Sequence, residues 1–206
     1  MFLMIMKSDD SYHHGHLRAE LLRLGLKALE TEGADEISLR LLSEQAGVSK
    51  TAPYRHFADK EAFLGALADE GFRLLFIALE RFAEEGPAGV SAMGRAYMDF
   101  AVAHPALYRL MNSPLACRMP GGQMVWARRS LRLLGESLAG RGAAHAPDER
   151  RDFDTNAATA AWAYIHGLVL LRIDGLFPGD LPQPDWDLLA ATVPAVAKPD
   201  TGHGAG

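Results

Sequence analysis

The sequence predicts an all-α protein with an N-terminal three-helix DNA-binding domain of helix-turn-helix type and a larger C-terminal helical domain. Alanine and leucine dominate the 206 residues while β-branched residues are scarce, a composition that favours helices. Apolar residues recur at helical spacing in segments separated by glycine and proline. The expected divisions are a disordered extension 1–11, a DNA-binding domain 12–58, a C-terminal sensor and dimerisation domain 59–197, and a disordered tail 198–206.

The pattern from Leu17 to Glu30 is that of a first helix, which Gly33 ends. Just before it, the run 12–16 contains three histidines that could suggest a metal site. Two of these histidines are adjacent, and no cysteine or carboxylate is spaced to complete the site. The run is therefore better interpreted as the start of the helix, close to phosphate. One face of the helix carries Leu17, Leu21, Leu24 and Ala28.

The stretch 37–60 has the pattern of two short helices joined by a tight corner. Ser38 can cap the first helix with its hydroxyl, and Gly47 supplies the positive φ that a helix C-terminus often needs. We expect Ser49 to cap the second helix and to leave the next residues at its exposed N-terminus. This is the layout of a helix-turn-helix, whose second helix enters the DNA major groove.

The chemistry of the second helix predicts which side chains meet DNA. Lys50 can contact guanine and Thr51 can contact thymine, although Lys50 can also be a solvated charge at a helix end. Tyr54 and Arg55 suit backbone phosphate, with packing alone as the alternative for Tyr54. Lys60, at the start of the next helix, can share a phosphate with a helix amide. The predicted DNA-contacting residues are Ser38, Arg40, Ser49, Lys50, Thr51, Ala52, Tyr54, Arg55, His56 and Lys60.

Pro53 affects the geometry of this second helix. With Ser49 as the cap, Pro53 falls at the fourth helical position and removes the first intrahelical hydrogen bond. It also biases Ala52 away from α geometry. We therefore expect the helix to start in an irregular or tightened form.

The same stretch resembles the DNA-binding domain of the tetracycline-repressor (TetR) family of bacterial transcription regulators. The resemblance implies a homodimer that binds an operator, most often as a repressor, and that releases DNA when a small molecule binds its C-terminal domain. It also implies that His56 lies near the DNA backbone and that Phe57 closes the core of the small domain. The residues that carry it are Ser38-Leu39-Arg40, Leu42, Ala46-Gly47-Val48-Ser49, Tyr54-Arg55-His56-Phe57 and Asp59-Lys60-Glu61.

Beyond the corner, the apolar pattern predicts a series of longer helices. The first runs from Asp59 to about Glu84, where Gly86 and Pro87 are expected to end it. Further helices are expected at 90–104, 105–112, 123–139, 148–176 and 184–197, with loops at 115–122 and 140–147. The alanine-rich helix 148–176 lets another helix approach closely. Together with the helix at 184–197, it is expected to pack against its symmetry mate as a four-helix bundle in a two-fold dimer.

A second resemblance concerns the C-terminal domain. Trp162, His166 and Gly167 form a Trp-x-x-x-His-Gly signature, which resembles that of one TetR subgroup. The segments 104–111 and 161–177 are similar to the same subgroup. The resemblance therefore extends over most of residues 12–177.

Three functions of the C-terminal domain stay open from the sequence. It can be a sensor with an apolar pocket for a lipophilic or aromatic effector, a domain that only dimerises, or an enzyme. The sequence shows no nucleophile elbow, phosphate loop or metal spacing, so we predict no catalytic residue and no cofactor. Aromatic residues at helical spacing are usually core, and a lone histidine such as His166 usually is too. The candidate pocket residues are Tyr97, Phe100, His104, Tyr108, Met111, Trp126, Trp162 and His166.

Charge and cysteine content set the remaining bounds. A net charge of −5 argues against a protein that coats DNA without specificity. DNA binding by this chain would depend on local clusters of Lys and Arg. Cys117 is the one cysteine, which excludes an internal disulfide and suggests the reducing cytoplasm. It is either a redox-sensing thiol or a packed one. The apolar opening 1–7 is too short for a signal-peptide core or a membrane span.

Overall fold

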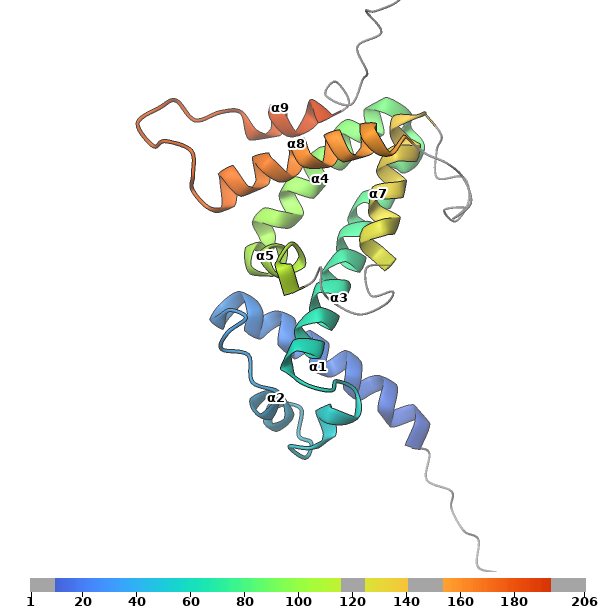
Figure 1. Ribbon diagram of the computed structural model, residues 1–206, viewed down its shortest axis with the longest axis vertical. Coiled ribbons are helices and arrows are strands. Elements are labelled where there is room, and N and C mark those ends of the chain that lie inside the picture. Colours follow the sequence, from blue (N-terminus) through green and yellow to red (C-terminus); the bar gives the residue numbers. More distant parts are fainter. Residues whose placement is uncertain (1–9, 116–124, 141–153, 194–206) are drawn as a thin grey trace, which may run out of the picture.

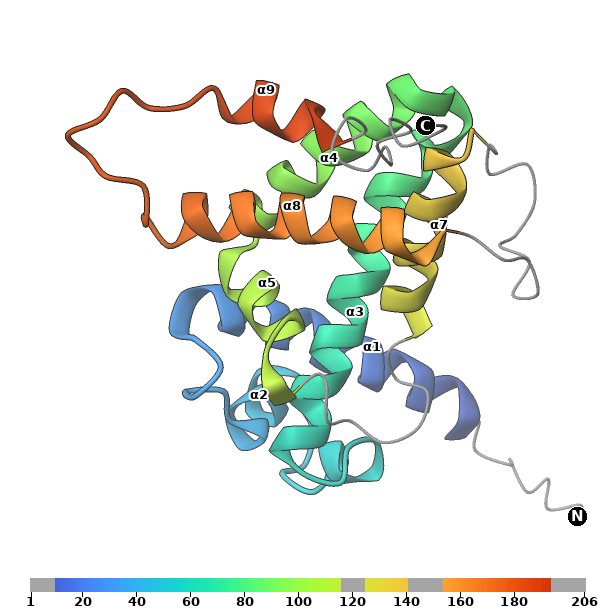
Figure 2. The same ribbon diagram turned by 45° about the horizontal axis from the view of Figure 1, so that its top comes forward.

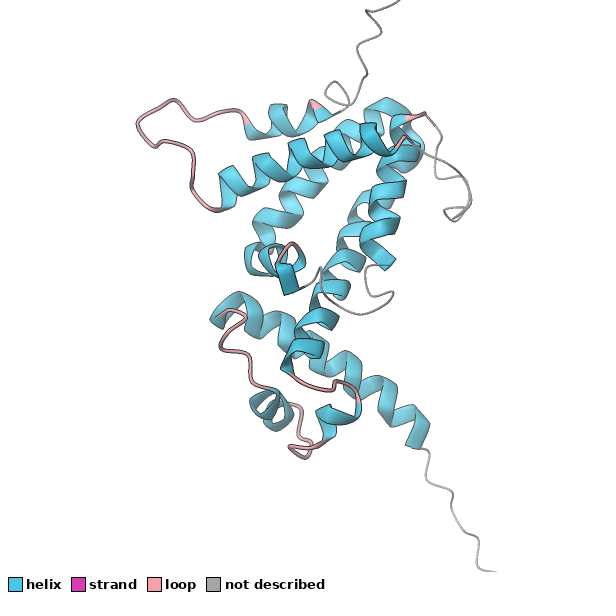
Figure 3. Cartoon of the chain, in the orientation of Figure 1, coloured by secondary structure: helices cyan, strands magenta, loops and turns pink. Residues whose placement is uncertain are grey.

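The computed structural model describes residues 10–115, 125–140 and 154–193, and every regular element in these ranges is a helix (Figure 3). The all-α prediction is confirmed. None of the described helices is long and apolar enough to cross a membrane. The elements are α1 (Asp10–Glu32), α2 (Leu39–Gln45), η1 (Ala52–Arg55), α3 (Lys60–Glu80), η2 (Ala83–Glu85), α4 (Gly86–Ala103), α5 (Pro105–Met111), α7 (Val125–Leu138), α8 (Thr155–Ile173) and α9 (Trp186–Ala191).

The helices form a small head and a larger body, and α3 belongs to both (Figures 1 and 2). The head contains α1, α2, η1 and the first turns of α3. In the body, α3 packs against α4, α5 and α7, while α4 also packs against α8 and α9. A single continuous helix thus connects the head to the body.

The core of the head is built around two phenylalanines. Phe57 is 3% exposed and meets Phe63 of α3 edge-on, with the ring centroids 4.9 Å apart. Phe63 reaches α1 at Gly25, where an added Cβ would collide with the Phe63 ring. The expectation that Phe57 closes this core is therefore confirmed, and Gly25 is what lets α1 approach α3.

The boundary between α3 and α4 differs from the prediction. α3 ends at Glu80, a 3₁₀ turn follows, and α4 begins at Gly86 with Pro87 in its first turn. The expectation that Pro87 terminates a helix was wrong. The backbone N–H groups in the first turn of a helix have no acceptor within the helix. Proline, which lacks this N–H, therefore fits there and starts α4.

The ends of α8 and α9 are set by capping residues. Asp154 accepts a hydrogen bond from the Ala157 amide at 2.9 Å, so α8 starts at Thr155, and the predicted start at 148 lies outside the described residues. Gly175 adopts a φ of 63° just beyond the last turn, so the helix stops short of the predicted 176. Asp185 caps α9 in the same way as Asp154 caps α8.

Parts of several predictions fall outside the described residues. These are the loops at 116–122 and 141–147, the start of the 148–176 helix, the end of the 184–197 helix, Cys117 and the 198–206 tail. At the other end of the chain, α1 begins at Asp10, inside the predicted 1–11 extension.

A close contact between two helices of the body lies at Gly94 of α4. An added Cβ there would collide with the backbone carbonyl oxygen of Ala190 on α9 and would press on the side chain of Val193. Backbone atoms cannot move aside as a flexible side chain does. Gly94 is therefore the residue that lets α9 lie on α4.

We expect Gly94→Ala to loosen α9 from α4 and to lower the free energy of unfolding by about 1–3 kcal/mol, the usual cost of overpacking. Thermal unfolding followed by circular dichroism should show a Tm lower by several degrees. Gly179→Ala is the matched control, since an added Cβ at Gly179 meets nothing within 4 Å. Equal Tm values for the two variants would contradict this packing.

Candidate functional site

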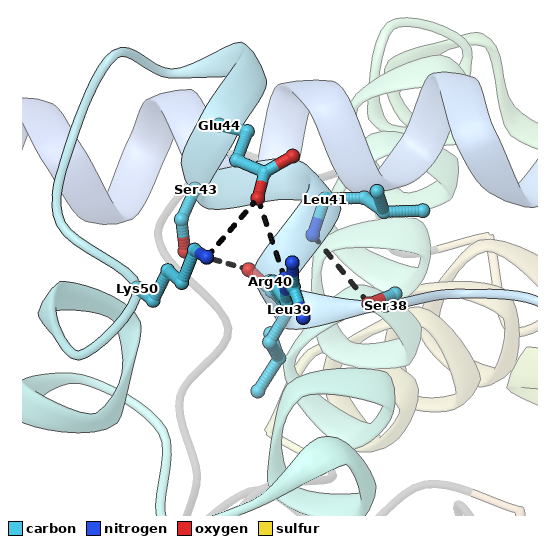
Figure 4. Close-up of polar contacts among 7 residues, drawn as sticks. All are labelled: Ser38, Leu39, Arg40, Leu41, Ser43, Glu44 and Lys50. Carbon is cyan, nitrogen blue, oxygen red and sulfur yellow. Dashed lines mark hydrogen bonds and ion pairs between the residues drawn. The ribbon is translucent and has the colours of Figure 1, made fainter.

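The first half of the corner forms as the sequence predicts (Figure 4). Ser38 is extended, with φ −125° and ψ 115°, and its side chain accepts from the Leu41 amide at 3.5 Å. Inside the same short helix, the buried Ser43 hydroxyl donates to the Leu39 carbonyl at 2.7 Å. The N-cap prediction for Ser38 is confirmed.

The turn that follows α2 is a Schellman motif. Gly47 has a φ of 69° and its amide donates to the Glu44 carbonyl at 3.2 Å. The Val48 amide donates back to the Ser43 carbonyl at 3.0 Å. This pair of bonds satisfies the last carbonyls of α2 and fixes the direction in which the chain leaves it.

The second half of the corner is not the α-helix that the sequence suggested. Residues 52–55 form a 3₁₀ helix whose N-cap is Thr51, without a side-chain cap, so the prediction of Ser49 as the cap was wrong. Because Pro53 has no amide, the Ser49 carbonyl accepts from Ala52 instead, at 3.0 Å. The expected tightening by Pro53 is confirmed, and it extends over the whole segment.

Most of the predicted DNA-contacting side chains lie on the outside of the head. Tyr54 is 56% exposed, which leaves its ring without the burial that packing alone requires. Ser38, Ala52, His56 and Lys60 are half-buried, and the exposed members are Arg40, Ser49, Lys50, Thr51, Tyr54 and Arg55. The residues thus come together on the corner and the start of α3.

One carboxylate lies between two of these cations (Figure 4). Oε1 of Glu44 is 3.3 Å from Nε of Arg40 and 3.8 Å from Nζ of Lys50. All three side chains are about half exposed or more, so solvent screens the pairs and each contributes little to stability. Their effect is electrostatic, because they place a negative charge beside Arg40 and Lys50.

Lys60 has a partner of its own within the head. Its ammonium donates to the Asp35 carbonyl at 2.5 Å, which ties the start of α3 to the loop after α1. An ammonium has three donor hydrogens, so this bond leaves capacity for a phosphate. The phosphate contact of Lys60 stays a prediction.

The body contains a cavity of about 340 Å³ that lies between α3, α4, α7 and α8. Four of the eight predicted pocket residues line it, namely Tyr97, Met111, Trp162 and His166. Its walls are otherwise mostly aliphatic. The other lining residues are Phe72, Leu75, Leu79, Met93, Gly94, Asn112, Ala127, Arg128, Ser130, Leu131, Leu134, Ile165 and Val193.

The remaining four predicted pocket residues lie elsewhere. Phe100 and His104 contact each other at the end of α4, with ring centroids 5.1 Å apart, and His104 is exposed. Trp126 packs against Phe76 at 5.3 Å. Tyr108 is fully buried behind the wall. The wall residues of α3 and α7 were missed because leucines at helical spacing look the same in a core and in a pocket wall.

A chain of hydrogen bonds joins three cavity residues through Tyr108. The Trp162 indole N–H donates to the Tyr97 hydroxyl at 3.3 Å, which lies 3.1 Å from the Tyr108 hydroxyl. The Tyr108 hydroxyl is 2.5 Å from Nδ1 of His166. Burial raises the pKa of both tyrosines and lowers the pKa of His166, so all of these groups are neutral at pH 7.

Head and body are also joined by α5, which is held at both ends. The Glu30 carboxylate of α1 accepts from the Ala106 and Leu107 amides at 3.1 and 3.0 Å. At the other end, Arg109 donates to the Asp174 carboxylate after α8 at 2.7 Å. Because Tyr108 and Met111 also belong to α5, this helix connects the cavity to α1.

In the described ranges, no group of three His, Cys, Asp or Glu side chains could hold a metal ion. The histidine run 12–16 lies at the start of α1, and its side-chain positions fall outside what the structure describes.

Two family models match the chain. The model for tetracyclin repressor-like C-terminal domains matches residues 90–196, and the model for bacterial regulatory proteins of the tetR family matches residues 21–67. The first match contains most of the cavity and the second contains the corner. No curated protein matches the chain.

Solved structures share the fold over most of the chain. A protein of unknown function from Rhodococcus sp. RHA1 is 34% identical, with 92% of this chain and 97% of that chain covered and a TM-score of 0.67. A bacterial regulatory protein in the tetR family from Rhodococcus RHA1 is 20% identical, with 88% and 94% covered and a TM-score of 0.58. The TetR family regulator PfmR from Thermus thermophilus is 19% identical, with 86% and 96% covered and a TM-score of 0.53. At such low identity, the last two show a shared fold alone.

Proposed function

The chain belongs to the TetR family of bacterial regulatory proteins, and on this premise we propose that it is a repressor which a small lipophilic or aromatic molecule releases from DNA. It binds a pseudo-palindromic operator as a homodimer. The observation that carries the proposal is the combination of an exposed helix-turn-helix and an apolar cavity of about 340 Å³ with a helix held between them. A ligand-blind regulator, the alternative, would have no use for the cavity.

The exposed corner supports operator binding. Lys50 and Thr51 immediately precede the 3₁₀ segment and are both exposed, as base-reading residues must be. Pro53 makes this segment stiff, so little conformational entropy remains to be lost when it meets DNA. Tyr54 and Arg55 follow on the exposed surface, where they suit phosphate contacts.

Exposed apolar side chains on the last two helices support a homodimer. Trp162 of α8 is 42% exposed and Leu188 of α9 is 61% exposed. Leu171 near the end of α8 is also exposed. Such a surface is expected to be covered by a second copy, and a two-fold axis there would present two corners to half-sites about 34 Å apart.

The contacts that fix α5 at both ends support the release of DNA by a ligand. A molecule in the cavity contacts Met111 and can shift α5, and α5 is bonded to Glu30 of the head. The bond joins a carboxylate to the N-terminus of a helix, where a negative charge is favoured. A movement of α5 would therefore pull on α1 and change the orientation of the corner.

Two further assignments follow from the sequence. The matched C-terminal model spans Trp162, His166 and Gly167, which supports the subgroup with the Trp-x-x-x-His-Gly signature. A single cysteine and a DNA-binding head both suit the cytoplasm, where bacterial DNA lies.

We expect Lys50→Ala and Thr51→Ala each to weaken operator binding by about 1–3 kcal/mol and to relax base preference, because base contacts carry specificity. Selection from a random duplex library, followed by titration of the selected site, measures both effects. If the Lys50→Ala and Thr51→Ala variants kept the wild-type preference, the corner would not be the base-reading element.

Lys60→Ala should instead weaken binding to all sequences alike and lower the salt dependence of binding by roughly one phosphate contact.

We expect Glu44→Gln to tighten DNA binding, up to roughly 5-fold at low salt, since it removes a negative charge from the surface and frees Arg40 and Lys50. Fluorescence anisotropy with a labelled operator duplex at two salt concentrations measures this. Glu136→Gln on α7 makes the same charge change far from the head and should have little effect. Weaker binding by Glu44→Gln would mean that the carboxylate itself contacts DNA.

We expect Glu30→Ala to uncouple α5 from the head. In the wild-type protein, operator binding should change amide hydrogen exchange in α5, because coupling between two sites is reciprocal. In Glu30→Ala this DNA-dependent change should disappear, and exchange of the Ala106 and Leu107 amides should be faster without DNA. Glu32→Ala, at the exposed end of α1, is the matched control. A DNA-dependent change that persists in Glu30→Ala would contradict the coupling.

A further inference from the structure

The polar groups in the cavity wall are mostly occupied by bonds to the protein. Nδ2 of Asn112 donates to the Tyr108 carbonyl at 2.9 Å, and the Ser130 hydroxyl donates to the Trp126 carbonyl at 2.9 Å. The Trp162 N–H is taken up by Tyr97. Three groups remain with capacity to donate, namely His166, the exposed Arg128 and the second N–H of Asn112.

The hydrogen-bond chain decides which nitrogen of His166 carries its proton. An indole N–H can only donate, so the Tyr97 oxygen must accept from Trp162. One arrangement then runs in a single direction: Tyr97 donates to Tyr108, and Tyr108 donates to Nδ1 of His166. The neutral imidazole is then protonated on Nε2, which is a donor.

The reverse arrangement leaves a donor unsatisfied. If Nδ1 donated to Tyr108 and Tyr108 donated to Tyr97, the Tyr97 proton would have no acceptor among the described residues. Tyr97 is buried, so an unmade bond there costs free energy. The first arrangement is favoured, and it leaves Nε2–H of His166 without a partner in the described part of the chain.

The charges around the cavity also favour a ligand with a hydrogen-bond acceptor. Among the described lining residues there is no Asp or Glu, while Arg128 adds a cation to the wall. An ammonium group would enter an apolar cavity without a carboxylate to pair with, which is strongly unfavourable. An oxygen acceptor would meet the Nε2–H of His166, which the hydrogen bond from Tyr108 already orients.

We propose that the effector is an apolar molecule with one carbonyl, phenol or carboxylate oxygen, which accepts a hydrogen bond from Nε2 of His166, and that cationic amines are excluded. The inference rests on the proposed sensing function and names the chemistry of that site. Tyr108 is a positioning residue, since it holds the His166 tautomer without lining the cavity. The cavity volume of about 340 Å³ is near the lower end of the usual range for small-molecule sites, so the effector is small.

Four probes with one skeleton test the chemical class on the full-length protein: 4-phenylbutan-2-one, 4-phenylbutanoate, 4-phenylbutylamine and butylbenzene. Isothermal titration calorimetry should detect binding of the ketone and the acid and no binding of the amine. Equal or tighter binding of the amine would overturn the proposal. Binding of neither the ketone nor the acid at millimolar concentration would overturn it as well.

Variants separate the hydrogen bond from hydrophobic partition. In His166→Phe, the affinity for the ketone should fall roughly 2- to 10-fold, while that for butylbenzene stays unchanged. Tyr164→Phe is the matched control on the same helix, because its hydroxyl bonds to Thr192 at 2.7 Å and does not line the cavity. Equal losses for both probes in His166→Phe would mean that the ring only fills space.

A spectroscopic readout keeps the proposal testable even if His166→Phe fails to fold. Nitrogen-15 NMR of the wild-type protein should show His166 protonated on Nε2, and Tyr108→Phe should mix the two tautomers. A His166 already protonated on Nδ1 in the wild type would overturn the proposal. A gel shift with each probe tests the sensing function separately: a ketone that binds through His166 without releasing DNA would refute the effector role and leave the chemistry of the cavity intact.

Discussion

The two hydrogen bonds that the Glu30 carboxylate accepts from the first turn of α5 join α1 of the head to the body. They form a polar link between the head and the body, in addition to the continuous helix α3. A carboxylate at a helix N-terminus meets both unsatisfied amides and the positive end of the helix dipole, so the bond is directional and favourable. The opposite end of α5 is fixed to the end of α8 through Arg109 and Asp174. A helix of seven residues that is held at both ends can move only if one of these contacts changes.

Local chemistry made the corner predictable, and one residue set the limit of the prediction. The Ser38 cap and the Gly47 turn need only a hydroxyl and a residue without a Cβ at the right places, so both could be predicted from the sequence. The 3₁₀ form of the second segment could be anticipated from Pro53, but its N-cap could not. That cap depends on the Ser49 carbonyl accepting from Ala52, which is a choice among several bonds of similar energy. Pro87 shows the same ambiguity, because proline suits the first turn of a helix as well as the end of the one before.

The cavity was harder to predict, for a reason that Tyr97 and Tyr108 illustrate. Both are aromatic residues on neighbouring helices, both are buried, and their hydroxyls lie 3.1 Å apart. Only Tyr97 lines the cavity. Helical periodicity shows which face of a helix turns inward, but whether that face meets another helix or an open space depends on how the helices cross. The sequence therefore supplied the right residue types, whereas the wall contributed by α3 and α7 required the three-dimensional arrangement.

An apolar cavity of about 340 Å³ is itself destabilising, because the side chains around it forgo contacts that a filled core would make. A ligand restores these contacts, but filling alone does not move the head. A ligand shifts an equilibrium only if it binds two states with different affinity. Those states must differ where the cavity wall and the head are joined, and Met111 and the Glu30 contact both lie on α5. In the proposed mechanism, the same short helix provides the wall that a ligand touches and the amides that hold α1, so two positions of α5 would suffice to give the two states different affinities for ligand and for DNA.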